Sequence, residues 1–381
     1  MTRLIFIVIL FLISLLAIFK AFEYHIWLLA IGVTEFPWLF SSITIVVLLT
    51  GFWVNKYQLT GTIIGCVALV LFLSPIARAY MVAAGLRNNF DTTFHVSNTD
   101  SVDAPFSFFR MFAGTVKVHY RTMPYVTYAD TTMKLDFYPT QIVGKKPCVI
   151  VVHGGSWSSG DSRQLPELNS YLATKGYNVA SINYRMAPKW QTPAPVEDVS
   201  NAIKYLTAHA EELHIDTDNF VLLGRSAGGQ IALLAAYTLH NKNIKAVIDF
   251  YGPADMVWGY SIPSNPLIMD SRKVMGDYVG GSYAQVPKKY FDSSPVEFVD
   301  KQSPPTLIIH GDNDVLVSPE HSRRLNLKLQ QNGIKHFWLK LPWATHGFDA
   351  NLNGPGGQLS TYTVLQFLKT INPPDPLKGE E

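Results

Sequence analysis

Between residues 123 and 341 the chain alternates short, nearly continuous apolar runs with helical segments, and this alternation restricts the fold more than any other feature. The apolar runs are Cys148–Val152, Tyr177–Tyr184, Phe220–Leu223, Ala246–Tyr251, Thr306–His310 and His336–Leu341. Strands that are apolar at almost every position are typical of parallel sheets buried on both faces. Val196–His209 and Ile231–Leu239 are predicted to be helices. The pattern predicts an α/β fold whose mostly parallel sheet is covered by helices on both faces.

Two less regular parts flank or interrupt this pattern. Residues 255–300 are rich in Pro, Tyr and Ser, and we interpret them as a cap-like insertion. Residues 86–122 show little clear periodicity and are interpreted as a connector. The globular domain is therefore expected over residues 123–375.

Residues 1–90 contain only seven charged side chains, which are Arg3, Lys20, Glu23, Glu35, Lys56, Arg78 and Arg87. Three stretches carry no charge at all, namely Leu4–Phe19, Phe36–Val54 and Leu59–Ala77. At ~1.5 Å rise per residue, a helix over either of the longer two covers roughly 28 Å, close to the hydrocarbon thickness of a bilayer. The polar turn Asn55–Gln58 joins these two as a helical hairpin. Residues 1–85 are therefore predicted to form about three membrane-spanning helices, with the lipid bilayer as their partner.

The first apolar stretch has a second interpretation, because a short apolar core preceded by Arg3 is also typical of a signal peptide. No small-x-small cleavage site precedes Glu23, and more apolar sequence follows at Ile26–Val33. Both observations favour a retained helix. A buried soluble helical domain is disfavoured because the three stretches show no polar face.

Charge gives a small orientation signal and argues against a nucleic-acid partner. With three spans, a cytoplasmic globular domain brings Lys20, Arg78 and Arg87 to the cytoplasmic side, whereas the reverse brings Arg3 and Lys56 there. The first arrangement places one more positive charge on the cytoplasmic side, so the positive-inside rule favours an integral membrane protein whose globular domain is cytoplasmic. Across the chain Lys and Arg outnumber Asp and Glu by only 31 to 29, so nothing indicates nucleic acid.

A glycine-flanked serine directly follows one of the predicted strands. The sequence there is Gly224-Arg225-Ser226-Ala227-Gly228-Gly229, and a predicted helix comes next. A serine hydroxyl is a weak nucleophile unless it is exposed beside a base, and a tight turn between strand and helix exposes it. The glycines two positions before and after leave room for that turn. Ser226 is therefore predicted to be the nucleophile of a serine hydrolase.

Two downstream loops offer a base and an acid for this nucleophile. His346 follows the last predicted strand and precedes the closing helix, where a general base is expected. The acid should lie between serine and histidine in chain order, and the turn after Thr306–His310 offers Asp312 and Asp314. Asp314 is preferred because the fourth residue after the His of a His-Gly turn commonly faces the site, whereas Asp312 would cap the turn. The predicted triad is Ser226, His346 and Asp314.

A second glycine loop, His153-Gly154-Gly155-Ser156-Trp157, ends the run Cys148–Val152. Glycines let a loop approach a substrate carbonyl closely enough to aim N–H donors at the oxyanion of a tetrahedral intermediate. We interpret this loop as an oxyanion loop, with His153 as its structural brace. Trp157, Trp258 and Trp343 are candidates for an apolar substrate pocket, and core packing accounts for each of them equally well.

Four motifs in this order resemble the hormone-sensitive-lipase-like branch of the α/β-hydrolases, and its feruloyl-esterase-like members most closely. They are Gly224–Gly228, the loop 153–155, Asn183–Pro188 and Ala344–Phe348, and the resemblance extends over about Val126–Thr370. It implies an α/β-hydrolase fold and a structural role for Asp198. It also implies oxyanion donors on the backbones of Gly155, Ser156 and Ala227. Many members have a third glycine where this chain has Ser156-Trp157, so the choice of loop N–H stays open.

Together these features predict a membrane-anchored enzyme that cleaves small-molecule carboxylic esters through an acyl-serine intermediate, with no metal and no cofactor. The same triad serves amidases, peptidases and acyltransferases, which are alternatives. A binding protein on a hydrolase fold without catalysis is less favoured, because every catalytic position holds a competent residue. The sequence carries no signal of oligomeric state.

Overall fold

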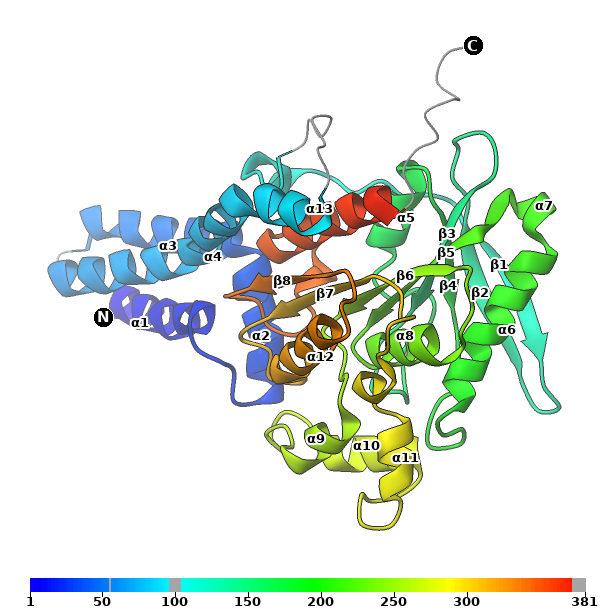
Figure 1. The fold of residues 1–381 in the computed structure, drawn as a ribbon. Coiled ribbons are helices and arrows are strands. Elements are labelled where there is room, and N and C mark those ends of the chain that lie inside the picture. Colours follow the sequence, from blue (N-terminus) through cyan, green and yellow to red (C-terminus); the bar gives the residue numbers. More distant parts are fainter. Residues whose placement is uncertain (55, 96–103, 372–381) are drawn as a thin grey trace.

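In the computed structural model of the protein, which describes residues 1–54, 56–95 and 104–371, eight strands form one sheet in the order β1-β2-β4-β3-β5-β6-β7-β8 (Figure 1). The strands are β1 (Arg121–Thr127), β2 (Thr132–Tyr138), β3 (Lys146–Val152), β4 (Asn178–Ile182), β5 (Ile215–Arg225), β6 (Ile244–Phe250), β7 (Thr306–Gly311) and β8 (His336–Leu341). β2 pairs antiparallel with β1 and β4, and the remaining pairs are parallel. The predicted mostly parallel sheet is confirmed, since each of the six apolar runs overlaps one strand from β3 to β8.

Helices cover both faces of this sheet. They are α5 (Pro166–Thr174), α6 (Ala194–Ala208), α7 (Ala210–Leu213), α8 (Ala227–Thr238), α12 (Glu320–Gln331) and α13 (Pro355–Ile371). Neighbouring residues of a strand point to opposite faces. Leu222 of β5 accordingly belongs to the core under α6 and α8, whereas Leu223 belongs to the core under α5 and α13. Both faces of the central strand are therefore buried, as its uninterrupted apolar sequence predicts.

The insertion expected around residues 255–300 lies between β6 and β7 and forms the lower lobe in Figure 1. Its elements are α9 (Met256–Ser261), α10 (Ser271–Val279), α11 (Pro287–Asp292) and the 3-10 helix η4 (Pro295–Phe298). α9 begins at Asp255, whose side chain accepts a hydrogen bond from the backbone N–H of Trp258. η4 packs against α8, so the insertion, here called the cap, is fixed beside the helix that starts after Ser226.

The amino-terminal region is a helical bundle that lies beside the sheet at the left of Figure 1. Its elements are α1 (Thr2–Ser14), η1 (Leu15–Ala17), α2 (Tyr24–Glu35), α3 (Pro37–Leu49), η2 (Thr50–Phe52) and α4 (Gln58–Phe94). α1, α3 and α4 pack side by side. Arg3 is buried between them and donates to the backbone oxygens of Leu48 and Gln58 at 3.3 Å each, which ties the end of α3 to the start of α4. Asn55 of the predicted turn lies outside the described residues.

Among the described residues, one helix, α4, is long and apolar enough to cross a membrane by itself. α2 and α3 reach that length only as a pair bent by 86°, and the segment Thr2–Ala17 is shorter. The sequence placed the end of the membrane region at residue 85, but α4 runs through this position. The reason is that Leu86, Phe90 and Phe94 continue its buried face into the core that also contains β8 and α13.

α2, to which the sequence analysis assigned no role, packs onto the globular domain. Glu35 at its end is fully buried, and its Oε2 accepts a hydrogen bond of 2.9 Å from the backbone N–H of Gly356, in the first turn of α13. An acceptor oxygen at a helix N-terminus is favourable because the first N–H groups of a helix have no partner within it. The backbone oxygen of Glu35 also accepts from Asn351 Nδ2 at 2.8 Å. The bend between α2 and α3 is thus anchored on α13.

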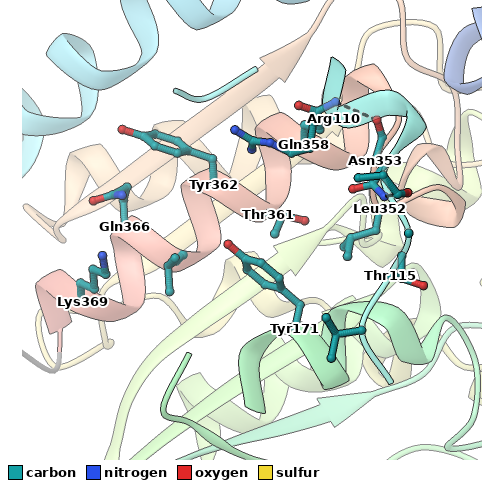
Figure 2. A pocket seen from close by; sticks show the side chains of 14 residues that line it. Arg110, Thr115, Tyr171, Leu352, Asn353, Gln358, Thr361, Tyr362, Gln366 and Lys369 are labelled. Atoms are coloured by element: carbon teal, nitrogen blue, oxygen red, sulfur yellow. Dashed lines mark hydrogen bonds between the residues drawn. The ribbon is translucent and has the colours of Figure 1, made fainter. Parts of the chain in front are cut away.

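The described part of the connector runs along α13 and contains the 3-10 helix η3 (Phe109–Phe112). Figure 2 shows the hollow of about 380 Å³ that it encloses, with Arg110 and Thr115 on one side and Gln358 and Tyr362 of α13 on the other. This hollow shares no lining residue with the pocket at Ser226. Residues 96–103 of the predicted connector lie outside the described residues.

Candidate active site

Ser226 lies between the end of β5 and the start of α8, with φ 53° and ψ −121°. Side chains do not fit at the flanking glycines. A Cβ on Gly224 would lie 2.0 Å from the oxygen of Gly228, and a Cβ on Gly228 would lie 2.2 Å from the oxygen of Val152. A positive φ at a non-glycine residue is strained, and such residues are concentrated at functional sites. The strand-turn-helix predicted from the sequence therefore forms a sharp elbow with Ser226 at its tip.

The structure brings Ser226, His346 and Asp314 into one hydrogen-bonded chain. Ser226 Oγ lies 2.9 Å from His346 Nε2, and His346 Nδ1 lies 2.7 Å from Asp314 Oδ2. When Nδ1 carries a proton and donates it to the carboxylate, Nε2 has a free lone pair that accepts the hydroxyl proton. Asp312, the other carboxylate of the turn, is exposed.

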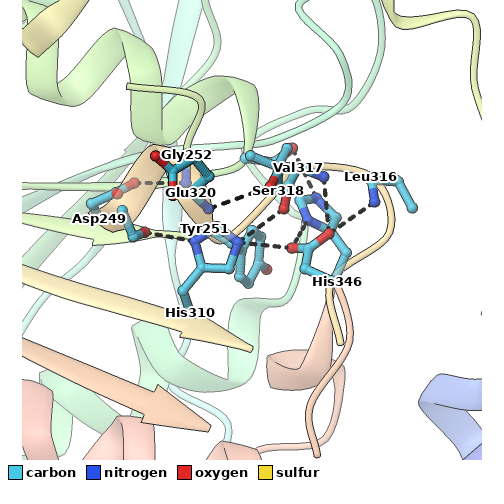
Figure 3. Close-up of polar contacts among 12 residues, drawn as sticks. Asp249, Tyr251, Gly252, His310, Leu316, Val317, Ser318, Glu320 and His346 are labelled. Atoms are coloured by element: carbon cyan, nitrogen blue, oxygen red, sulfur yellow. Dashed lines mark hydrogen bonds and ion pairs between the residues drawn. The ribbon is translucent and has the colours of Figure 1, made fainter. Parts of the chain in front are cut away.

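Asp314 is surrounded by hydrogen-bond donors. Figure 3 shows the residues that carry them, His310, Leu316, Val317 and His346, close to one another. Its Oδ1 accepts from the backbone N–H groups of Leu316 and Val317, at 2.9 Å each. Its Oδ2 lies 3.2 Å from His310 Nε2 in addition to its contact with His346. Burial alone raises the pKa of Asp314, but the charges and hydrogen bonds of His346 and His310 outweigh it and hold the pKa well below its usual range. The side chain is therefore a carboxylate that fixes the orientation of the His346 ring.

The three residues assigned to the oxyanion site lie on two turns that meet at the serine. Ala227 is the first residue of α8, so its N–H has no acceptor within the helix. Gly155 has φ 114° and Ser156 has φ 53°, and the backbone there leaves its strand conformation. A Cβ on Gly154 would lie 3.4 Å from the Cβ of Ser226, which shows how closely the two turns approach.

His153 holds this loop in place and is buried. Its Nδ1 lies 2.7 Å from the oxygen of Gly154, and its ring stacks on Tyr184 with centroids 4.4 Å apart. Burial lowers the pKa of His153 to about 4, so the ring is neutral near pH 7. The contacts agree with the brace inferred from the sequence. Gly154 N–H is itself engaged by Gln164 Oε1 at 2.7 Å.

Ser226 faces a pocket of about 170 Å³ between the elbow and the cap. Apolar side chains from the cap, such as Met269 and Met275, line it together with Trp157. Trp157 is fixed in this position because its Nε1 donates to Gln230 Oε1 at 2.9 Å and its ring stacks on Tyr278 at 4.5 Å. Trp157 is therefore held in place as an apolar part of the pocket lining.

The structure corrects two assignments around this pocket, those of Trp343 and Trp258, and adds His321 to its lining. Trp343 is fully buried in the core of α13 and β8, where its bulk fills space between helix and sheet. Trp258 lines a separate hollow on the cap, where the guanidinium of Arg324 lies 5.6 Å from its ring centroid. His321, to which the sequence analysis assigned no role, is buried and lines the pocket. Burial lowers the pKa of His321 to about 3.

A buried ion pair behind His346 was missed by sequence reasoning. Arg225 Nε lies 2.5 Å from Asp349 Oδ2, and the hydroxyl of Tyr251 donates to Asp349 Oδ1. The ring of Tyr251 in turn packs on the ring of His346, with centroids 4.3 Å apart. The two charged residues are 124 positions apart, so no spacing pattern links them. The only available signal was that Asp349 follows His346 by three residues in a loop already assigned to the site.

The contribution of the amino-terminal region to the site was also missed. Trp27 Nε1 donates a hydrogen bond of 3.0 Å to the backbone oxygen of His346. Lys20, in the link between α1 and α2, lines the pocket. Within residues 1–54, 56–95 and 104–371, no three His, Cys, Asp or Glu side chains are grouped so that they could hold a metal ion.

Residues 135–329 match the family model BD-FAE. The chain is similar to two proteins of Mycobacterium tuberculosis: the probable carboxylic ester hydrolase LipM (29% identity over 243 residues, 60% of this chain and 56% of LipM) and the esterase LipC (29% over 261 residues, 64% and 63%). The matches thus span between half and two thirds of these relatives.

A solved structure of the thermophilic esterase Est2 from the Planctomycetes species Thermogutta terrifontis is similar in fold. The TM-score is 0.56 at 22% identity, and the match covers 68% of this chain and 95% of that one. At this level of sequence identity, the structural similarity is evidence about the fold alone. The arrangement of strands and helices is the α/β-hydrolase fold, as the sequence motifs implied.

Proposed function

Because the chain belongs to the BD-FAE family, we propose that it is a membrane-anchored serine hydrolase that cleaves carboxylic esters through an acyl-serine intermediate at Ser226. The observation that carries this proposal is the hydrogen-bonded chain from Ser226 through His346 to Asp314 at the edge of a pocket between the elbow and the cap. Two relatives that are named as ester hydrolases support an ester over an amide as substrate.

In the first half-reaction Ser226 Oγ attacks the ester carbonyl carbon while its proton passes to His346 Nε2. The carbonyl oxygen becomes an oxyanion, and the backbone N–H of Ala227 together with that of Gly155 or Ser156 donates hydrogen bonds to it. The C–O bond to the leaving group then breaks, and His346 returns the proton to the departing alkoxide. The products are a free alcohol and an acyl group on Ser226.

In the second half-reaction a water molecule attacks the acyl carbon and gives a proton to His346 Nε2. The intermediate collapses, the Ser226 oxygen takes that proton back, and the carboxylic acid leaves. Asp314 keeps its negative charge throughout and stabilises the imidazolium that forms twice in the cycle. Its four donors, two amides and two imidazoles, keep it ionised, which is the state that this role requires.

Labelling with a fluorophosphonate probe tests the proposed nucleophile. The full chain should become labelled, the S226A variant should not, and S156A, which changes another serine of the pocket, should remain labelled. S226A should also lose at least about 10⁴-fold in kcat towards a short p-nitrophenyl ester. Labelling that persists in S226A would show that another residue is the nucleophile.

The preference for esters is tested with matched substrates. A p-nitrophenyl ester and the p-nitroanilide of the same acyl group differ only in the scissile bond. We expect turnover of the ester and little or none of the anilide. Equal kcat/KM for the two would favour an amidase or a peptidase instead.

The proposed anchor consists of α1, α3 and the first half of α4. These helices expose large apolar side chains such as Phe6, Val46 and Val70 on the outside of the bundle. The Arg3 guanidinium lies at the far end, where backbone oxygens of α3 and α4 accept its hydrogen bonds and compensate its charge. The positive charges of Lys20 and Arg78 lie at the end nearer the sheet, which agrees with a cytoplasmic catalytic domain by the positive-inside rule.

An alkaline carbonate wash tests this anchor on the full chain. We expect the protein to stay in the membrane pellet and to be released only by detergent, because integral helices resist the removal of peripheral contacts. Release into the carbonate supernatant would contradict membrane insertion. A shortened chain that begins at Asp91 is unsuited to this test, because it lacks Leu86 and Phe90, which belong to the core of the globular domain.

A further inference from the structure

The link between α1 and α2 lies at the mouth of the catalytic pocket. The backbone oxygen of Ile18 accepts a hydrogen bond of 3.2 Å from Asn313 Nδ2, in the loop after β7. The backbone oxygen of Phe22 accepts one of 3.0 Å from Asn265 Nδ2, in the cap. Between these two ties, Lys20 lines the pocket itself. The amino-terminal region is thus part of the entrance through which a substrate must pass to Ser226.

Four large apolar side chains stand exposed around this entrance, and we call them the apolar rim. Phe19 and Phe22 of the link are 62% and 64% exposed, and Ile262 and Leu267 of the cap are 59% and 64% exposed. The two halves of the rim meet, since Tyr24 N–H donates to the backbone oxygen of Leu267 at 3.2 Å. Single apolar side chains scattered over a surface are ordinary, but several gathered at the entrance of a ligand pocket indicate a surface that contacts another molecule or a membrane.

The rim continues the apolar outer surface of the bundle. Phe6 and Leu12 of α1 are more than half exposed, and no charged residue lies between them and Phe19. The arrowheads of β7 and β8 in Figure 1 point towards the bundle, and the loops that follow these two strands carry Asp314 and His346. Lys20, next to Phe19, has the long stem that keeps a charge in the headgroup layer while its neighbours contact lipid.

We propose that the apolar rim is immersed in the surface of the bilayer and that the pocket receives esters of membrane-resident amphiphiles directly from the lipid phase. This inference rests on the serine hydrolase function proposed above, and it names the substrate class of that same site. Burial of the four rim side chains in lipid removes their apolar surface from water, which is favourable. It also places the entrance where a lipid-borne ester is concentrated.

The size of the pocket fits this class of substrate. At about 170 Å³ it is smaller than the roughly 300–1,000 Å³ of pockets that enclose a whole drug-sized ligand. It therefore holds the ester and the first part of an apolar chain against Met269 and Met275. The remainder of the chain passes over Phe22 and Leu267 and stays in the bilayer.

The test compares a bilayer-borne ester with a soluble one, using the full chain reconstituted in phosphatidylcholine vesicles. The substrates are 4-methylumbelliferyl oleate, dissolved in the vesicles, and p-nitrophenyl acetate, added to the buffer. The rim variant combines Phe22→Ser with Leu267→Ser; neither side chain lines the pocket, and only their backbones make the hydrogen bonds described above. The matched control is Val143→Ser, which changes a 92% exposed apolar residue in the loop between β2 and β3.

We expect the rim variant to lose about tenfold or more in turnover of the oleate, because two apolar side chains no longer gain from contact with lipid. Turnover of the acetate should stay within about twofold, and Val143→Ser should change neither rate. A rim variant that turns over both esters like the unaltered protein would refute the proposal. So would an unaltered protein that cleaves the acetate but not the oleate. Failure to cleave either ester would instead contradict the proposed function itself.

Discussion

Trp27, on the amino-terminal helix α2, donates a hydrogen bond of 3.0 Å from its Nε1 atom to the backbone oxygen of His346. Its ring lies 6.4 Å from the imidazole, measured between centroids. The loop that carries the proposed general base is therefore braced by a helix that precedes it by more than 300 residues. The brace acts through the backbone, so it fixes where His346 lies and leaves both ring nitrogens free for Ser226 and Asp314.

Removal of this brace should reduce catalysis more than binding. Trp27→Phe keeps an aromatic ring but loses the donor, at a cost of about 0.5–1.5 kcal/mol for a neutral hydrogen bond. We expect kcat towards a soluble p-nitrophenyl ester to fall by about 2- to 10-fold with KM nearly unchanged. Trp53→Phe, at a residue that is 80% exposed, is the control and should leave kcat as it is. A change confined to KM would mean that Trp27 shapes the pocket instead of positioning His346.

The two carboxylates of the turn after β7 should differ sharply in importance. Asp314→Asn removes the group that fixes the tautomer of His346 and stabilises its cation, and kcat should fall by about 10⁴-fold. Asp312→Asn changes an exposed side chain and should lower kcat by less than a factor of about two. Steady-state kinetics on both purified variants checks this. A larger loss in the Asp312 variant would overturn the assignment of Asp314.

The ion pair between Arg225 and Asp349 should matter for stability. Asp349→Ala leaves the Arg225 guanidinium buried without its partner, and such losses amount to about 3–5 kcal/mol. The unfolding midpoint in detergent should fall accordingly. Asp292→Ala, which breaks the exposed pair with Lys288, is the control and should move the midpoint little. An Asp349 variant as stable as that control would show that the buried pair contributes nothing.

Much of the catalytic domain could be predicted because its signals are local. The central strands are apolar runs, and the elbow at Ser226 is a turn whose glycines have no room for a Cβ. β1 and β2 were not singled out because they mix exposed and buried positions, which produces a weak pattern. The role of α2 could not be predicted at all. Its apolar residues resemble a continuation of the first apolar stretch, and only tertiary packing shows that Trp27 and Glu35 contact the loops around the site.

Asp249 provides a test based on pH, because it is fully buried at the end of β6. Burial raises its pKa to about 7, although a hydrogen bond from Gly252 N–H to Oδ1 and the nearby His310 act in the opposite direction. In the unfolded chain the pKa of an Asp side chain is about 3.9. Between about pH 4 and pH 7 the unfolded chain therefore releases this proton while the folded chain keeps it. Rising pH therefore favours unfolding, so Asp249 lowers the free energy of unfolding progressively as the pH rises from about 4 to about 7.

Asp249→Asn keeps the shape of the side chain and the oxygen that accepts from Gly252, but it cannot ionise. The stability of this variant relative to the unaltered protein should therefore increase from pH 5 to pH 7, by at most about 1.4 kcal/mol per pH unit. Unfolding midpoints of the full chain in detergent, measured at several pH values, provide the comparison. Asp292→Asn, at an exposed position, should give a curve parallel to that of the unaltered protein. Parallel curves for Asp249→Asn as well would mean that the buried carboxyl is already ionised in the folded protein at pH 5.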